Sequence, residues 1–314
     1  MNAEIFSEWL CRLGHQVVKT RSSYWYDASP HVYQAFPYHW MIRPSDEELR
    51  DLLRMNRAIA LRYSTPVDNP AGRISYHVIY DAPRYGLDIL DRRTRQNVRT
   101  GLDRCRVEPI PLERLAEEGW ILEMDTASRQ GRSVKTTRES WRRRYLSAAD
   151  LPGFEAWGAS VENRLAASLL VFRMDDCCEL ISQQCHRDFI AARVNHALAY
   201  TVTQTLRSRP GVSTIFYTLQ SLDAPPSVDD FKFRMGYAVK QVRQRVVFHP
   251  LLALVIRPAS LAFVERLVRW NQGNPVLPKV AGMMRFYLEG RRPLAQQDWP
   301  ECLTRGGDTI AKGG

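Results

Sequence analysis

The sequence predicts a mixed α+β fold, and three patterns in its second half support this prediction. The first is a strand–turn–strand–turn–strand run over 154–184, in which apolar and polar residues alternate between short polar turns. The second is an amphipathic helix over 194–207, where apolar side chains recur at helical spacing. The third is a strand over 212–219, a short helix over 228–235 and a strand over 239–248. The resulting order, β-β-β-α-β-α-β, indicates antiparallel strands that continue into a mixed sheet covered by helices.

The residues before 154 also alternate between helical and strand-like patterns. Ser45 is expected to cap a helix, with Glu48 three residues later completing a capping box. The aromatic residues of 24–40 suit strands that pack in the core, although they could also line a pocket for an acyl chain or ring. In chain order the expected elements are a helix at 3–13, strands within 16–40, 58–63 and 74–80, and helices at 91–106, 119–131 and 138–147.

The chain past Pro250 is basic and helical in pattern, and its glycine-rich end, 305–314, is expected to be a loose tail. We therefore divide the sequence into three parts. Residues 1–118 hold the aromatic strands and a basic helix, residues 119–250 hold the β-β-β-α-β-α-β run, and residues 251–314 form a helical, basic extension.

Composition limits the class of protein and of partner. The chain has 314 residues, of which 45% are hydrophobic and 25% charged, which is ordinary for globular proteins and excludes a wholly disordered, collagen-like or coiled-coil chain. Its 44 Lys and Arg against 34 Asp and Glu give a net charge of +10. Such a surplus favours an anionic partner, either a phosphate-bearing co-substrate, a nucleic acid or an anionic membrane face.

Several functions lack the residues that they require. The six cysteines form no CxxC pair and the seven histidines are scattered, so we expect neither a disulfide framework nor a metal site. No Walker A loop and no GxGxxG are present. The N-terminus is a poor signal peptide and no apolar run could span a membrane, so the sequence predicts a cytoplasmic protein.

Two stretches resemble one known group of enzymes. DRRTRQNVRTGLDRCRVEPIPL at 91–112 is similar to the basic helix-then-strand segment of the GNAT-like group that includes the Fem-type aminoacyl-tRNA-dependent peptidyltransferases. VDDFKFRMGY at 228–237 resembles the short helix and turn before the last sheet strand of that group. The element order of 154–248 resembles the C-terminal part of the GNAT acyltransferase fold. The resemblance implies a GNAT-like fold, with two GNAT-like halves as in Fem-type proteins, and an acyltransferase.

The resemblance also implies a catalytic lysine. Many GNAT enzymes carry on the short helix a tyrosine that protonates the leaving thiolate, upstream of a glycine-aromatic pair. Here Lys232 takes that place before Gly236 and Tyr237, and Fem-type enzymes have a Phe-Lys pair like Phe231-Lys232. A lysine there can stabilise a developing oxyanion or the leaving oxygen. Without the resemblance, Lys232 is an ordinary surface lysine on an amphipathic helix.

The donor site is expected at the start of the helix at 194–207. Common GNAT enzymes hold the pyrophosphate of acyl-CoA on a glycine-rich turn at this helix N-terminus, where backbone amides approach the phosphates. This chain has Arg193 and Asn195 in place of the glycines, a departure that disfavours acetyl-CoA. Arg193, Asn195 and Arg187 are therefore the candidate donor-binding residues, since an arginine can bind phosphate directly. The alternative is that both arginines are solvated charges.

A general base and an anion-binding face complete the candidates. His186 is the candidate base because its reference pKa lies near neutrality, with Asp223, Glu179, Asp229 and Asp230 as further possibilities.

In the basic helix, one stripe carries the arginines and a neighbouring stripe of Val98, Leu102 and Cys105 is expected to face the core. The stripe suits a substrate phosphate or an RNA acceptor stem, or is only a solvated face. Its arginines are Arg92, Arg95, Arg99 and Arg106, of which the first three are the candidate anion-binding residues.

The sequence thus predicts an N-acyltransferase that moves an acyl group from a thioester donor, acyl-CoA or an acyl-carrier protein, to an amine acceptor. This donor is a co-substrate, and no permanently bound cofactor is expected. The first alternative is a Fem-type transferase that uses aminoacyl-tRNA, with tRNA as a partner. The second is a non-catalytic module that binds RNA or another polyanion, and the third is an enzyme that touches anionic lipid through the basic C-terminal region.

Overall fold

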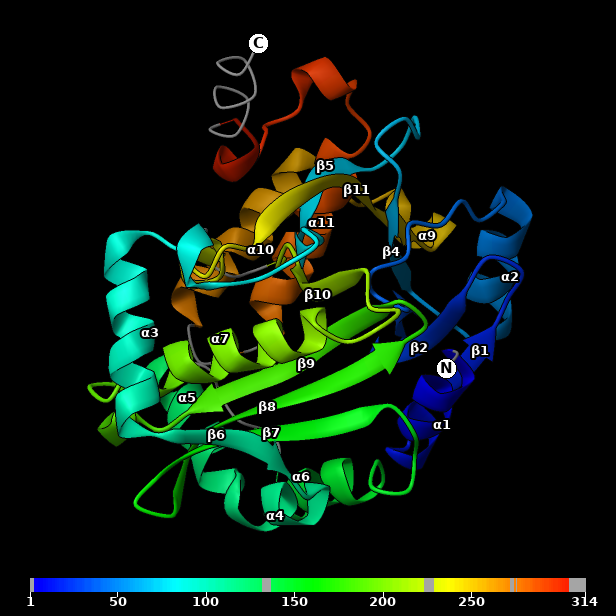
Figure 1. Ribbon diagram of the computed structural model, residues 1–314. Helices are drawn as coiled ribbons and strands as arrows, with labels where there is room; N and C mark the ends of the chain where they lie inside the picture. The colour runs from blue at the N-terminus through cyan, green and yellow to red at the C-terminus, as the bar shows by residue number, and fades with distance from the viewer. Residues whose placement is uncertain (1–2, 132–136, 223–228, 272–273, 275, 305–314) are drawn as a thin grey trace. The chain divides into compact units, whose positions relative to one another are not determined.

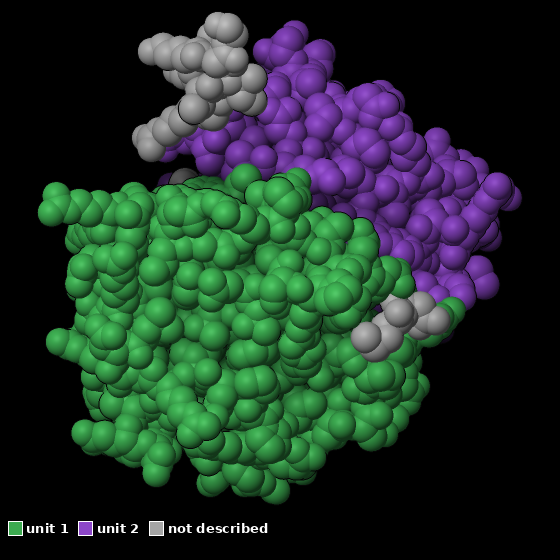
Figure 2. Space-filling view, viewed as in Figure 1, with its two compact units in different colours: residues 1–13, 79–218, 229–238 green, residues 14–78, 219–228, 239–314 purple. Residues whose placement is uncertain are grey.

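The computed structural model describes residues 3–131, 137–222, 229–271, 274 and 276–304. The chain forms two compact units that interleave along the sequence (Figure 2). Unit 1 consists of residues 1–13, 79–218 and 229–238, and unit 2 consists of residues 14–78, 219–228 and 239–314. The boundaries expected from sequence at residues 118 and 250 separate two GNAT-like halves and an extension, not compact units. These boundaries stay a prediction.

The sheet of unit 1 confirms the predicted meander and its continuation as far as the strand at 212–219, whereas the strand predicted at 239–248 belongs to unit 2. Its strands lie in the order β10-β9-β8-β7-β6, with antiparallel pairing between β6, β7, β8 and β9 and parallel pairing between β9 and β10 (Figure 1). The strands are β6 (Arg106–Ile110), β7 (Phe154–Val161), β8 (Arg164–Met174), β9 (Cys177–Cys185) and β10 (Thr214–Leu219). Because β9 and β10 are parallel, their carboxyl ends reach the same edge of the sheet.

Helices cover this sheet. In Figure 1, α7 lies across the strands with α3 beside it. The two helices approach closely at Gly101, where a Cβ would lie 2.6 Å from the carbonyl oxygen of Arg193 and 2.9 Å from the Cβ of Ala197. The helices of unit 1 are α1 (Ala3–Arg12), α3 (Arg92–Arg104), α4 (Leu112–Glu118), α5 (Trp120–Arg129), α6 (Arg138–Leu146), α7 (Val194–Arg207) and α8 (Asp230–Arg234), with single turns η1 (Leu87–Ile89) and η2 (Arg187–Phe189).

Unit 2 is built on a second run of strands, in the order β1-β2-β3-β4-β11-β5. β3 and β4 are parallel, whereas β4 and β11 are antiparallel. The strands are β1 (Val17–Lys19), β2 (Tyr24–Ser29), β3 (Val32–Phe36), β4 (Ala60–Thr65), β5 (Arg73–Tyr80) and β11 (Ala238–Phe248). The helices are α2 (Asp46–Met55), α9 (Pro250–Ala253), α10 (Pro258–Trp270) and α11 (Leu277–Glu289), with the turn η4 (Leu294–Gln296).

The aromatic strands of unit 2 supply its core, as the first of the two sequence interpretations expected. Trp25, Tyr33 and Phe36 are fully or almost fully buried. Trp25 and Tyr33 pack in one cluster with the leucines of α2, and the Trp25 ring meets Tyr63 edge-on at 5.6 Å. Burial of such large side chains dominates the stabilisation of a core.

Three local expectations need correction. Ser45 caps α2 by accepting a hydrogen bond from the Glu48 amide at 3.1 Å, but the Glu48 carboxylate accepts from the Ser22 amide instead of completing a capping box. Leu102 is 40% exposed, because Gly101 rather than Leu102 lies against α7. The pattern analysis also missed the seven-residue helix α4.

Candidate active site

The predicted catalytic lysine is largely buried in unit 1 and lies between a carboxylate and an aromatic ring. Only 13% of the Lys232 side chain is exposed, and its ammonium forms an ion pair with Asp229. The same nitrogen lies 5.1 Å from the centre of the Tyr217 ring, within the range of a cation–π interaction. A charge at this depth is stabilised by such partners, so Lys232 is not the freely solvated surface lysine of the alternative interpretation.

The short helix that carries Lys232 is held at its end. Gly236 follows it with φ +85°, a left-handed conformation that glycine adopts without strain. A Cβ at Gly236 would lie 3.0 Å from the side chain of Ile89. The Tyr85 hydroxyl donates to the Met235 carbonyl at 2.7 Å, which gives a helix-end oxygen a hydrogen-bond donor. These contacts fix where α8 ends and therefore where Lys232 lies relative to β10.

A cation–π contact and two hydrogen bonds connect the lysine to the start of α7. The Tyr217 hydroxyl donates to the Gln183 side-chain oxygen, and the Gln183 amide donates to Asn195 Oδ1 at 3.2 Å. The structure thus brings together Lys232, a catalytic candidate, and Asn195, a donor-binding candidate, through one residue of β10 and one of β9. Tyr217 and Gln183 are not among the residues predicted from sequence, since no local motif marks them.

Further tyrosines surround this network. The rings of Tyr217 and Tyr237 meet edge-on at 5.0 Å, and the Tyr237 hydroxyl lies 2.7 Å from Thr203 Oγ1. Burial raises the pKa of Tyr217 and of Tyr237 well above the ordinary tyrosine value. Both phenols are consequently neutral near pH 7 and can donate hydrogen bonds.

Arg193 has the backbone conformation of a glycine at the N-cap of α7. Its φ of 60° and ψ of 27° are left-handed, which a non-glycine residue adopts at a cost. Its carbonyl accepts from the amides of His196 at 3.0 Å and Ala197 at 3.2 Å, so the turn enters the helix directly. The chain therefore keeps a glycine-type turn at this point while placing an arginine side chain on it.

Phe231 and His196 pack together beside this turn. Their rings meet edge-on at 5.2 Å. Burial, together with the charges of Arg193 and Arg234, lowers the pKa of His196 to about 4. His196 is therefore neutral near pH 7. The sequence analysis passed over this histidine because a lone histidine in a helix carries no motif.

Other predicted site residues form the connection between β9 and α7. Arg187 donates from its backbone amide to Asp125 Oδ2 at 2.9 Å and from its Nε to Oδ1, while Arg129 also donates to Oδ2 at 2.9 Å. His186 Nδ1 accepts from the Asp188 amide at 3.3 Å. None of these contacts involves Lys232. The donor-binding role of Arg187 and the general-base role of His186 stay predictions, and Asp223 lies outside the described residues.

In the arginine stripe of α3, one side chain forms a hydrogen bond within the protein and two are exposed. Arg92 and Arg99 are exposed, whereas Arg95 is half-buried and donates to the Leu90 carbonyl at 3.0 Å. Asp91 caps this helix through hydrogen bonds from the Arg93 and Thr94 amides. The exposed pair, Arg92 and Arg99, is available to an anion at the surface of unit 1.

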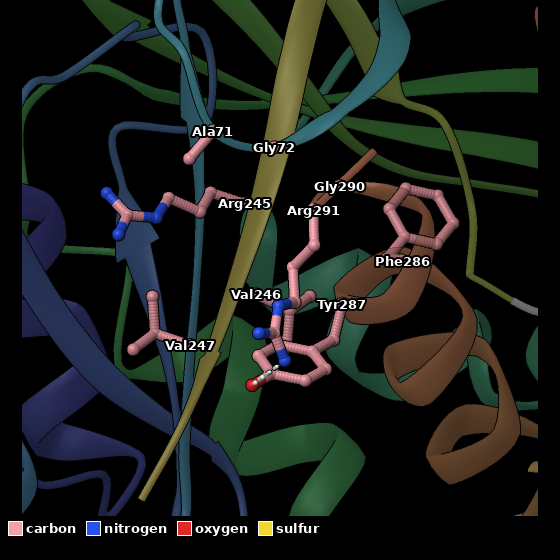
Figure 3. A pocket seen from close by; sticks show the side chains of 9 residues that line it. All are labelled: Ala71, Gly72, Arg245, Val246, Val247, Phe286, Tyr287, Gly290 and Arg291. Carbon is pink, nitrogen blue, oxygen red and sulfur yellow. Dashed lines mark hydrogen bonds between the residues drawn. The ribbon is translucent and has the colours of Figure 1, made fainter. Parts of the chain in front are cut away.

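Unit 2 contains a separate cavity of about 290 Å³ (Figure 3). Its lining includes two arginines, Arg245 and Arg291, and no carboxylate. Arg291 donates to the Tyr287 hydroxyl at 3.2 Å, and Figure 3 shows the Arg245 side chain extending to the opposite side of β11 from Arg291. Because the two guanidinium groups do not converge, this cavity is a weaker candidate for chemistry than the Lys232 site.

Two kinds of feature are absent from the described residues. Within them, no group of three or more His, Cys, Asp or Glu side chains could hold a metal ion. Likewise, none of the described helices is both long and apolar enough to cross a lipid bilayer.

Comparisons with known proteins rest on structure. No family model matches the sequence, and no curated protein matches it significantly. The structure is similar to that of FemX, with a TM-score of 0.55 and 12% identity over 80% of this chain and 93% of that one.

Two other solved structures show the same likeness. One is the C-terminal DUF2156 domain ascribed to a lysylphosphatidylglycerol synthetase from Agrobacterium fabrum, with a TM-score of 0.54 and 12% identity over 82% of this chain and 91% of that one. The other is a conserved protein of unknown function from Bacteroides thetaiotaomicron, with a TM-score of 0.52 and 10% identity over 79% of this chain and 92% of that one. The chain therefore has a GNAT-like fold of the kind found in Fem-type proteins.

Proposed function

We propose that this protein is a transferase that moves an acyl or aminoacyl group from an activated ester to an amine, with Lys232 as its catalytic cation. The observation that carries the proposal is the buried Lys232 ammonium beside Asp229 and Tyr217, on the short helix that follows β10. A fixed positive charge in a site of low polarity lowers the energy of a transition state in which negative charge grows on oxygen.

The chemistry runs through a tetrahedral intermediate. The acceptor amine attacks the donor carbonyl, a C–N bond forms, and the carbonyl electron pair moves onto oxygen beside Lys232. Collapse of the intermediate breaks the bond to the leaving oxygen, or to sulfur in a thioester, and yields an amide. The amine loses one proton and the leaving group gains one. Asp229 can accept the proton of the amine while Lys232 donates one to the leaving group. Transfer of a proton from Asp229 to Lys232 then restores the ion pair, so the pair undergoes no net change.

The residues at the start of α7 favour one class of acyl donor over another. A CoA pyrophosphate needs glycines for close approach to the backbone amides of this turn. Here the turn carries the side chains of Arg193 and Asn195, and Asn195 accepts a hydrogen bond from Gln183. This arrangement supports a polyanionic donor that meets side chains rather than bare backbone. We therefore rank aminoacyl-tRNA ahead of acyl-CoA, the reverse of the order expected from sequence.

One structural relative supports an aminoacyl group as the group transferred. One solved structure of similar fold is ascribed to a lysylphosphatidylglycerol synthetase, whose name describes a lysyl group joined to a lipid. We therefore propose that the group this protein transfers is an aminoacyl group. The donor binds as a co-substrate, and the proposal includes no resident cofactor.

The test uses the stability of the product bond. The purified protein is incubated with tRNA carrying radiolabelled amino acids, or with labelled acetyl-CoA or a labelled long-chain acyl-CoA, and a bacterial small-molecule extract as the pool of amines. Label that survives mild alkali has moved from an ester to an amide. We expect alkali-stable label from charged tRNA, and a decrease of about 100-fold or more in the Lys232→Ala variant.

Lys240→Ala is the matched control, since Lys240 is an exposed lysine on β11. Its rate should match the wild-type rate. Equal product from wild type and Lys232→Ala would remove Lys232 from the mechanism. Product from acyl-CoA alone would restore the thioester donor. Binding of charged and uncharged tRNA without any product would instead support the polyanion-binding alternative.

A further inference from the structure

A run of large apolar side chains is exposed to solvent on α9, α10 and the residues between them. Leu251, Leu254 and Val255 are 62–71% exposed. On α10, Phe263 is 61% and Trp270 is 74% exposed. Single exposed apolar residues are ordinary, but a concentration within twenty residues makes this segment a candidate contact surface.

α10 packs on one side only. Its inner side chains, Leu261, Val264 and Leu267, are half-buried, and Glu265 forms an ion pair with Arg285 of α11 at 2.7 Å. No residue of α10 is buried in the structure as described. The outer side presents Phe263, Arg266 and Trp270, which recur at helical spacing and so share one stripe.

The charges on this segment are positive. Arg257, Arg266 and Arg269 are all exposed. The Arg266 guanidinium lies 5.0 Å from the centre of the Trp270 ring, so cationic and aromatic groups share the outer stripe. Glu265 supplies the one carboxylate between 249 and 271, and Arg285 already pairs with it.

We propose that the outer stripe of α10, together with the exposed apolar residues of 251–255 that precede it in sequence, binds the surface of an anionic lipid bilayer. Tryptophan, phenylalanine and arginine on one helix face match the boundary between lipid headgroups and acyl chains. The arginines attract the anionic headgroups, while Phe263, Trp270 and the apolar residues of 251–255 enter below them. α10 has 13 residues, so it lies along the bilayer surface and does not cross it. This proposal is independent of the proposed transferase activity.

The test is co-sedimentation of the full-length protein with vesicles of phosphatidylcholine alone or of phosphatidylcholine mixed with phosphatidylglycerol. We expect binding to the anionic vesicles, and a decrease of at least about tenfold in the partition constant of a Phe263→Ser/Trp270→Ser double variant. An Arg266→Gln/Arg269→Gln variant should also bind less and should depend less on salt. Met55→Ser is the matched control, because Met55 is 81% exposed on α2, and should bind as the wild type does.

All five substituted side chains are exposed, so each variant should fold, and circular dichroism and thermal unfolding check this. Failure of the wild type to bind anionic vesicles would overturn the proposal, and so would equal binding by the double variant. Light scattering tests the competing occupant, a second copy of this chain. A dimer that the Phe263→Ser/Trp270→Ser variant abolishes, with no vesicle binding, would assign the surface to self-association.

Discussion

The Lys232 ammonium lies 5.1 Å from the centre of the Tyr217 ring, and hydrogen bonds through Gln183 fix that ring relative to the start of α7. A catalytic candidate on a short helix is therefore positioned by a strand and a helix that precede it in sequence. This relationship leads to the first prediction.

Tyr217 should position Lys232 mainly through its ring. A cation–π contact contributes roughly 0.5–2 kcal/mol, which corresponds to about two- to thirtyfold in rate. We expect Tyr217→Leu to lower kcat/KM by that factor. Tyr217→Phe keeps the ring and loses only the hydrogen bond to Gln183, so it should lose less activity. Steady-state kinetics with the donor that supports turnover measures both. Equal defects in Tyr217→Phe and Tyr217→Leu would assign the effect to the hydroxyl, which both variants lack.

Arg193 combines a backbone role with a side-chain role, and two substitutions separate them. Glycine accepts a φ of 60° freely, so Arg193→Gly should change the free energy of unfolding by no more than about 1 kcal/mol. A β-branched residue is strained there, so Arg193→Val should destabilise by about 2 kcal/mol. Urea unfolding measures the difference.

Both Arg193 variants should also bind a tRNA donor more weakly, with a shallower salt dependence, because one cation is lost. Filter binding over a series of salt concentrations checks this expectation. Because Arg193→Gly keeps the backbone turn and removes only the side chain, unchanged affinity of this variant would show that the arginine side chain does not contact the donor.

Gly101 permits the close approach of α3 and α7. A Cβ at this position would meet the Arg193 carbonyl at 2.6 Å and Ala197 Cβ at 2.9 Å, so Gly101→Ala should destabilise unit 1 by about 1–3 kcal/mol. Chemical denaturation measures the loss. Gln96→Ala is the control, since Gln96 is exposed on the same helix, and it should stay within about 0.5 kcal/mol of wild type. Equal stability of the two variants would contradict the packing described for these helices.

His77 should make the stability of the protein depend on pH. This side chain is buried in unit 2 with its Nε2 atom 2.8 Å from Ser64 Oγ, and burial lowers its pKa from 6.5 to about 3. The unfolded chain therefore binds a proton near pH 6 that the folded chain excludes. Stability is present above pH 6.5 and is lost as the pH falls toward 3.

Between about pH 7 and about pH 5, this histidine should lower the free energy of unfolding by about 2 kcal/mol. Urea unfolding at both pH values tests this, with His77→Gln as the comparison. The variant should show a smaller decrease over the same interval, whatever its stability at pH 7. The same pH dependence in both proteins would assign acid sensitivity to other groups.

Local pattern was sufficient for most elements. The helix predicted at 194–207 begins and ends at those residues, and the meander over 154–184 is confirmed within a few residues at each strand. These elements are long and strongly periodic, so spacing alone reveals which side of each is buried. α4 was missed because seven residues give too little periodicity. Leu102 was misplaced because helical spacing does not specify that a neighbouring helix contacts a glycine.

The sequence by itself determined the element order, the basic surplus, and Lys232 as the catalytic candidate through its resemblance to a Phe-Lys motif. Tertiary structure decided the partners of that lysine. Tyr217, Gln183 and Asn195 lie on β10, β9 and α7, and they meet because β9 and β10 pair in parallel and both end at one edge. The physical reason is that local periodicity reports which face of an element is apolar, whereas hydrogen bonding between distant strands determines which side chains converge.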